Sequence, residues 1–104
     1  MTKSEVLNIL KANLNLIFVT NQSLNAHLEQ LLNAAIKLIE REGYTFILDE
    51  NDEIVFGAED TQLAVMYASY LYRKRATDEG MPRMLRWALN NAIFSQKVST
   101  EDAT

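Results

Sequence analysis

Residues 60–96 decide the fold of this chain. Residues 60–75 read DTQLAVMYASYLYRKR, residues 76–81 read ATDEGM, and residues 82–96 read PRMLRWALNNAIFSQ. Apolar side chains recur at three- and four-residue steps in the first and third of these stretches, which is the period of an α-helix with one buried face. The segment therefore predicts two helices joined by a polar break.

The ends of these two helices have recognisable residues. Asp60 is the predicted N-cap of the first, because a short carboxylate can accept an unpaired backbone N–H there. Pro82 fits the first turn of the second, where its missing N–H has no helical partner in any case. On the first helix, a helical wheel at 100° per residue places Tyr67 on the apolar face and Ser69 nearer the opposite face.

Two more helices are expected upstream. Thr2 and Glu5 have the spacing of a capping box, and an apolar stripe follows as far as about residue 19. Residues 20–23 offer a second N-cap, and a long stripe at helical spacing then continues to about residue 42. Gly43 suits the left-handed C-cap position, which strains other residues, so the chain must turn there.

An acidic insert lies between the second and third helices. Residues 44–48 and 54–56 are rich in β-branched and aromatic residues and flank the sequence DENDE at residues 49–53. The insert is either a small β-hairpin or an extended loop. Its acidic residues are candidates for contact with a partner: Asp49, Glu50, Asp52 and Glu53.

Four helices with one apolar stripe each can bury one another only as a small bundle. We therefore predict an all-α fold, a small four-helix-type bundle with a short acidic loop or β-hairpin insert between helices two and three. A chain of 104 residues without internal repeats or linkers is expected to form one domain, residues 1–97. Residues 98–104 are expected to be a flexible C-terminal tail.

The composition offers little for catalysis. The chain has no cysteine and one histidine, His27, so no usual set of transition-metal ligands can be assembled. Its three glycines are isolated, which excludes a Gly-rich phosphate loop, and no apolar run approaches the length of a membrane span. We expect no enzymatic activity, no metal, no cofactor and no membrane contact, and synthesis in the cytoplasm.

Charge is distributed unevenly along the chain. Residues 1–60 carry four basic and ten acidic side chains, and residues 61–104 carry six basic and four acidic ones, so that the two parts total −6 and +2. A net charge of −4 makes general DNA binding unfavourable, because binding depends on neutralising phosphates. A solvated surface explains the charges simply, but they would also let the acidic part of one copy meet the basic part of another.

The basic residues cluster around the break between helices three and four. Three of them, Arg73, Lys74 and Arg75, end helix three, where cations interact favourably with the helix dipole. Arg83 and Arg86 begin helix four, where positive charge opposes the dipole, so they need a tertiary or external partner, and an acidic patch on another subunit would suit them.

Trp87 follows Arg86 directly and lies off the centre of the predicted buried stripe. It could sit at the rim of the core or on an exposed patch, and we expect the rim. Large aromatic residues near arginines are nevertheless typical of binding hot spots.

The order of these features resembles the small α-helical head-tail connector (adaptor) proteins of tailed bacteriophages. The matching parts are a long helix ending in residues 40–44, a helix end at residues 71–75, the dipeptide Met81-Pro82 and a closing helix around residues 84–94. The resemblance implies a ring of identical subunits beneath the portal protein that extends the DNA channel and meets the next head-completion or tail protein. DNA would pass without sequence-specific binding, and the protein would be found in the virion. The acidic insert has the least correspondence to the family.

Two other classes of function are open. Helices three and four could be a helix-turn-helix of a small DNA-binding regulator, although residues 76–81 are longer than the three- or four-residue turn of that motif. A protein-binding module with an apolar groove is the other alternative.

Overall fold

The computed structural model describes residues 1–16, 22–74 and 80–102, with side chains described as far as residue 98. It contains α1 (Lys3–Asn13), α2 (Gln22–Arg41), α3 (Ala58–Lys74) and α4 (Arg83–Asp102), and no strand is formed within the described ranges. The protein is an all-α, small helical bundle, as predicted. No helix in the described part is long and apolar enough to cross a membrane.

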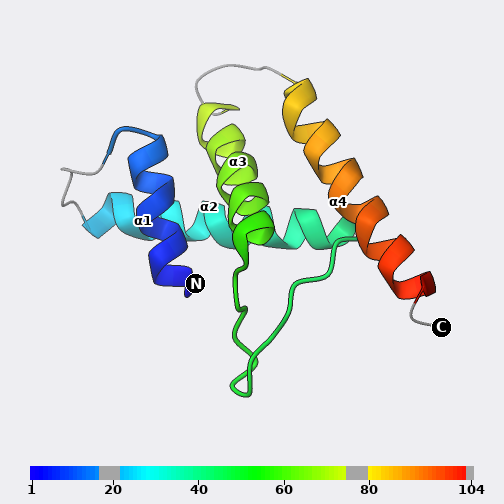
Figure 1. Ribbon diagram of the computed structural model, residues 1–104. Coiled ribbons are helices and arrows are strands. Elements are labelled where there is room, and N and C mark those ends of the chain that lie inside the picture. Colours follow the sequence, from blue (N-terminus) through cyan, green and yellow to red (C-terminus); the bar gives the residue numbers. More distant parts are fainter. Residues whose placement is uncertain (17–21, 75–79, 103–104) are drawn as a thin grey trace.

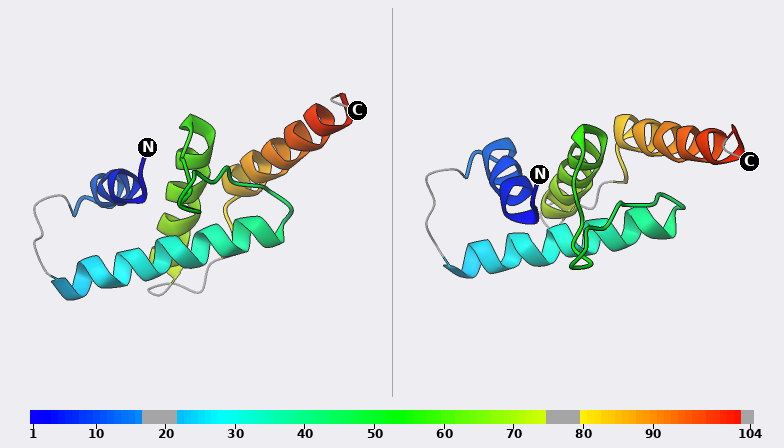
Figure 2. Two further views of the ribbon diagram at one scale, coloured as in Figure 1. Left: turned by 90° about the horizontal axis from the view of Figure 1, so that it is seen from below. Right: turned by 60° about the horizontal axis from the view of Figure 1, so that its bottom comes forward.

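Three helices lie across the fourth. Figure 1 shows α1, α3 and α4 in a row over the long α2, and the two views in Figure 2 show the same row from other directions. The molecule measures 48 × 35 × 18 Å. Since a helix with its side chains is about 10–12 Å across, this thickness corresponds to two layers of helices.

Helix α3 is the centre of the fold, because α1, α2 and α4 all pack against it. Its Leu63, Ala64 and Ala68 are almost completely buried. Ser69 is also buried, and it accepts a hydrogen bond of 2.7 Å from the Asn13 side-chain amide. The predicted position of Ser69 near a solvent-facing side was therefore wrong, because α1 covers that side.

Local sequence signals set several helix ends. The capping box at α1 is confirmed, since the Thr2 hydroxyl accepts from the Glu5 N–H and the Glu5 carboxylate accepts from the Thr2 N–H. Gly43 has φ of 112°, as expected of a left-handed C-cap after α2. The prediction for α1 was too long: the helix ends at Asn13, and residues 17–19 of the predicted helix lie outside the described ranges, as do residues 20 and 21 of the second cap.

Asp60 does not cap α3 in the predicted way. The helix begins at Ala58, and Asp60 sits in its first turn, where one carboxylate oxygen accepts the Gly57 N–H at 2.8 Å. The other oxygen accepts a hydrogen bond from the hydroxyl of Tyr44, which comes from the segment after α2. The Asp60 side chain thus accepts the unpaired backbone N–H that precedes the helix and also connects the insert to α3.

This contact gives the stability a pH dependence. Burial raises the pKa of Tyr44 above its ordinary value of 10.0, and the hydrogen bond to Asp60 raises it further. The folded chain therefore keeps a proton that the unfolded chain loses, so stability is complete below about pH 10 and falls by up to about 1.4 kcal/mol per pH unit above it. Urea titrations from pH 8 to 11.5 should show this fall.

Tyr44→Phe should reduce the slope above pH 10. It should not remove the slope completely, because burial also raises the pKa of Tyr67. Equal slopes for wild type and Tyr44→Phe would contradict the assignment.

The acidic insert is a loop with one isolated antiparallel bridge, between Leu48 and Ile54. Its side chains alternate: Phe46 and Phe56 are buried with their rings 6.0 Å apart, while Ile47 and Val55 are exposed. The apolar runs around the acidic sequence thus serve to hold the insert on the helices.

Helix α4 differs from the prediction at both ends. It begins at Arg83, so Pro82 precedes the helix and supplies its carbonyl to the Arg86 N–H at 3.1 Å. The helix continues to Asp102, beyond the predicted domain boundary at residue 97. The described part of the predicted tail, residues 98–102, is therefore helical, and residues 103–104 lie outside it.

Candidate functional site

The predicted basic residues gather where α3 ends and α4 begins. Arg73 and Lys74 form the last turn of α3, Arg83 is the first residue of α4, and all three are exposed. Arg75 lies outside the described residues. Lys74 Nζ is 5.8 Å from the centre of the Tyr70 ring, close enough for a cation–π contact.

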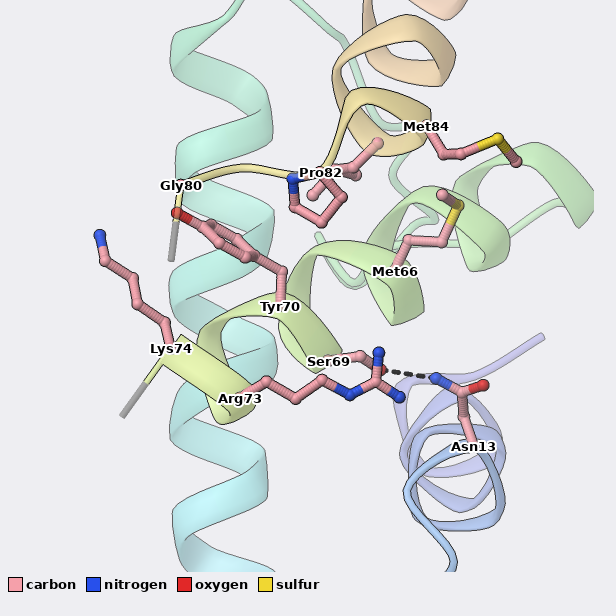
Figure 3. A pocket seen from close by; sticks show the side chains of 10 residues that line it. Asn13, Met66, Ser69, Tyr70, Arg73, Lys74, Gly80, Pro82 and Met84 are labelled. Atoms are coloured by element: carbon pink, nitrogen blue, oxygen red, sulfur yellow. Dashed lines mark hydrogen bonds between the residues drawn. The ribbon is translucent and has the colours of Figure 1, made fainter. Parts of the chain in front are cut away.

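A pocket of about 340 Å³ opens at this basic end. In Figure 3, Arg73 and Lys74 extend from the end of α3 in different directions around it, and Tyr70 lies between α3 and Gly80. The Asn13–Ser69 hydrogen bond forms part of its wall. The pocket therefore combines two cations with apolar surface from α3 and α4, a surface suited to a carboxylate side chain on an apolar stem. Its lining residues are Asn13, Met66, Ser69, Tyr70, Arg73, Lys74, Gly80, Pro82, Met84 and Leu85.

Arg86 has a partner within its own chain. Its two guanidinium Nη atoms lie 2.7 and 3.5 Å from the two carboxylate oxygens of Glu42, at the end of α2. This hydrogen-bonded pair raises the pKa of Arg86. Arg86 therefore has the tertiary partner that was predicted as one of two possibilities, and the pair fastens α4 to the end of α2.

Trp87 is 67% exposed, so the expectation that it lies at the rim of the core was wrong. The buried stripe of α4 is narrow because α4 stands at the end of the row of helices. Its well-covered residues are Leu85, Leu89 and Ala92. Trp87 belongs to an exposed surface.

The acidic residues form an exposed turn. Asp49 holds this turn together, because its carboxylate accepts the N–H groups of Asn51 and Glu53 at 2.8 and 3.0 Å. The other acidic residues, Glu50, Asp52 and Glu53, are exposed. No group of three or more side chains that could hold a metal ion occurs in the described ranges.

The two charged regions lie at opposite ends of α3. The acidic insert precedes the first residue of α3 and the basic cluster includes its last turn, and Figure 1 shows them on opposite sides of the molecule. With a rise of 1.5 Å per residue, the 17 residues of α3 separate the two regions by roughly 25 Å. Among the described residues, the acidic turn and the basic cluster therefore occupy opposite ends of α3.

Two features were missed in the sequence. The Gln96 side-chain amide pairs with the backbone N–H and C=O of Thr45, both at 2.8 Å, and joins α4 to the insert. A second apolar stripe on α4 is exposed, and its spacing, from Met84 through Trp87 to Phe94, is visible in the sequence. The pairing of Gln96 with Thr45, in contrast, has no local sequence signal, because the two residues are 51 positions apart.

Comparisons with protein-family profiles, curated proteins and solved structures find no match to this chain. The order of its sequence features and the geometry of its two charged ends therefore carry the argument about function.

Proposed function

We propose that this chain is a non-enzymatic head-tail connector subunit of a tailed bacteriophage or prophage. Identical copies form a ring below the portal protein, extend the DNA channel and join the head to the next head-completion or tail protein. The chain would be found in the host cytoplasm before assembly and at the head-tail junction of the virion afterwards.

The opposite placement of the two charged regions carries this proposal. A closed ring requires each subunit to present one patch to the neighbour on one side and a different patch to the neighbour on the other. The acidic turn and the basic pocket are two such patches, and they lie at opposite ends of α3. Glu50 or Glu53 of one copy would enter the pocket beside Lys74 of the next.

The charges also suit a passage for DNA. A protein of net charge −4 gains little from phosphate contacts, so packaged DNA can slide past it without being held. In this arrangement Lys74 and Arg83 contact the neighbouring subunit rather than DNA. Arg86 is paired with Glu42 of its own chain.

Charge reversal at each end tests the ring. Glu50→Lys with Glu53→Lys, or Lys74→Glu with Arg83→Glu, is expected to abolish assembly on the portal complex of the same phage, measured by co-sedimentation and native mass spectrometry. All four changes together should restore assembly, because the two patches exchange their charges. Asp49 and Arg86 are left unchanged, since each has a structural partner.

Gln30→Glu is the control, because it adds a negative charge at an exposed position of α2 that lines neither the basic pocket nor the hollow beside the acidic insert. Circular dichroism should show unchanged helicity for every variant. Normal assembly by both reversed pairs would remove the charged ends from the mechanism, and failure of the wild-type chain to join the portal complex would contradict the connector function itself.

Sequence-specific DNA binding at physiological salt would instead favour a regulator. Residues 75–82 separate α3 from α4, which is longer than the turn of a helix-turn-helix. A salt titration of binding to genomic fragments distinguishes the two functions, because the connector is expected to show no salt-resistant site.

A further inference from the structure

Helix α4 carries a second apolar stripe that faces solvent. Met84 is 71% exposed, Trp87 and Phe94 are each 67% exposed, and Val98 is 38% exposed. Asn91, also exposed, lies between Trp87 and Phe94. These five positions follow one another at steps of three, four, three and four residues.

The stripe is on the far side of α4 from the core. At 100° per residue, its centre lies roughly 150° around the helix from the buried stripe of Leu85, Leu89 and Ala92. Figures 1 and 2 show α4 at the end of the row of helices, with its C-terminal half extending past the rest of the molecule. A second helix can therefore reach the C-terminal part of the stripe, around Phe94 and Val98, without meeting the body of the protein, while Met84 at the other end also lines the pocket between α3 and α4.

Steps of three and four residues form the seam between two helices of a coiled coil. We infer that α4 pairs in parallel with α4 of a second copy, through a seam made of Met84, Trp87, Asn91, Phe94 and Val98. The same stripe on each copy is its own complement, as a two-fold contact requires. This inference goes beyond the connector function and does not depend on it.

Asn91 and the flanking charges favour the parallel arrangement. Met84, Asn91 and Val98 occupy the a positions of the heptad, and a single polar residue at such a position fixes register by pairing with the partner's Asn91. Arg83 and Lys97 flank the seam on one side. An antiparallel pair centred on Asn91 would bring Arg83 near the partner's Lys97, a contact between like charges that the parallel pair avoids.

The area of the stripe suits a modest, concentration-dependent dimer. A buried aromatic side chain covers about 150–250 Å², so the exposed parts of Trp87 and Phe94 are on the order of 100–170 Å² each. Counted on both copies, with Met84 and Val98 added, the contact approaches the roughly 1,000 Å² needed for a specific interface.

Disulfide trapping tests the pairing and its direction. The chain contains no cysteine, so each engineered thiol reports on one position. Met84→Cys and Val98→Cys should each form a cross-linked dimer alone in a glutathione redox buffer, as seen on a non-reducing gel. Gln30→Cys, on the exposed face of α2, should cross-link far more slowly.

Cross-linking only in a mixture of the two seam variants would overturn the parallel direction. Rates no faster than that of Gln30→Cys would overturn the pairing.

Trp87 provides an independent measurement. It is the only tryptophan, so its emission should shift to shorter wavelength as the protein concentration rises and the pair forms. Trp87→Glu should weaken association by roughly 30-fold or more in sedimentation equilibrium, as expected of a hot-spot aromatic, while Trp87→Leu retains it. Glu50→Lys with Glu53→Lys changes only the acidic turn and tests the ring, and Trp87→Glu tests the pair, so the two can fail separately.

Discussion

Replacing Leu89 with alanine is expected to lower the free energy of unfolding by about 3 kcal/mol, within the usual range for a buried leucine. Leu89 is completely buried, and it is the middle of the narrow stripe by which α4 packs on the fold. Its neighbours along the stripe are Leu85 and the small Ala92, which are also buried. Urea denaturation followed by circular dichroism measures the loss.

Asn90→Ala is the control, since Asn90 is exposed beside Leu89 and its replacement should change stability by less than about 0.5 kcal/mol. A loss below about 1 kcal/mol for Leu89→Ala would mean that α4 does not depend on this contact.

The second large effect is expected at Asp60. Asp60→Ala removes the acceptor of two hydrogen bonds, one from the Gly57 N–H and one from the Tyr44 hydroxyl, and leaves the buried Tyr44 hydroxyl without this acceptor. Hydrogen bonds to a charged group contribute about 1.5–3 kcal/mol, so we expect a loss of about 2–4 kcal/mol. Thermal and urea unfolding should agree on it.

Glu59→Ala removes the other negative charge of this turn and should cost less stability than Asp60→Ala, because Glu59 is exposed, although its carboxylate also acts on the Tyr44 hydroxyl. The double variant with Asp60→Ala and Tyr44→Phe should lose less free energy of unfolding than the two single variants added together. The reason is that Tyr44→Phe removes the hydroxyl that Asp60→Ala would otherwise leave without its acceptor. Strict additivity would show that the two side chains do not interact.

The features that sequence predicted well are those with a local cause. The Thr2 and Glu5 capping box lies within one helical turn, and Gly43 has a backbone conformation that side chains disfavour. The four apolar stripes report the helical period directly, so the number of helices and the all-α class follow from them.

The burial of Ser69 and the exposure of Trp87 were predicted wrongly because both depend on which helices lie beside them, and a helical wheel does not contain that information. A wheel gives the direction of Ser69 on α3, but only the fold shows that α1 covers that direction. The same limit applies to Trp87, whose exposure depends on the position of α4 at the end of the row.

The candidate site was predictable in part. Composition located the acidic and basic residues, and the length of α3 then places them at opposite ends. The partner of Arg86 is 44 residues away at Glu42, and the partner of Asp60 is 16 residues away at Tyr44. Such pairs depend on how helices cross, which single-residue patterns do not specify.

The pairing of Gln96 with Thr45 affects how the insert can associate with other chains. An extended segment with unpaired N–H and C=O groups can recruit a strand from another chain, and here the exposed Ile47 stands two residues from Thr45. One amide side chain occupies both groups of Thr45, as a neighbouring strand would. Gln96 thus blocks the two backbone groups of Thr45 through which a strand of another chain would pair.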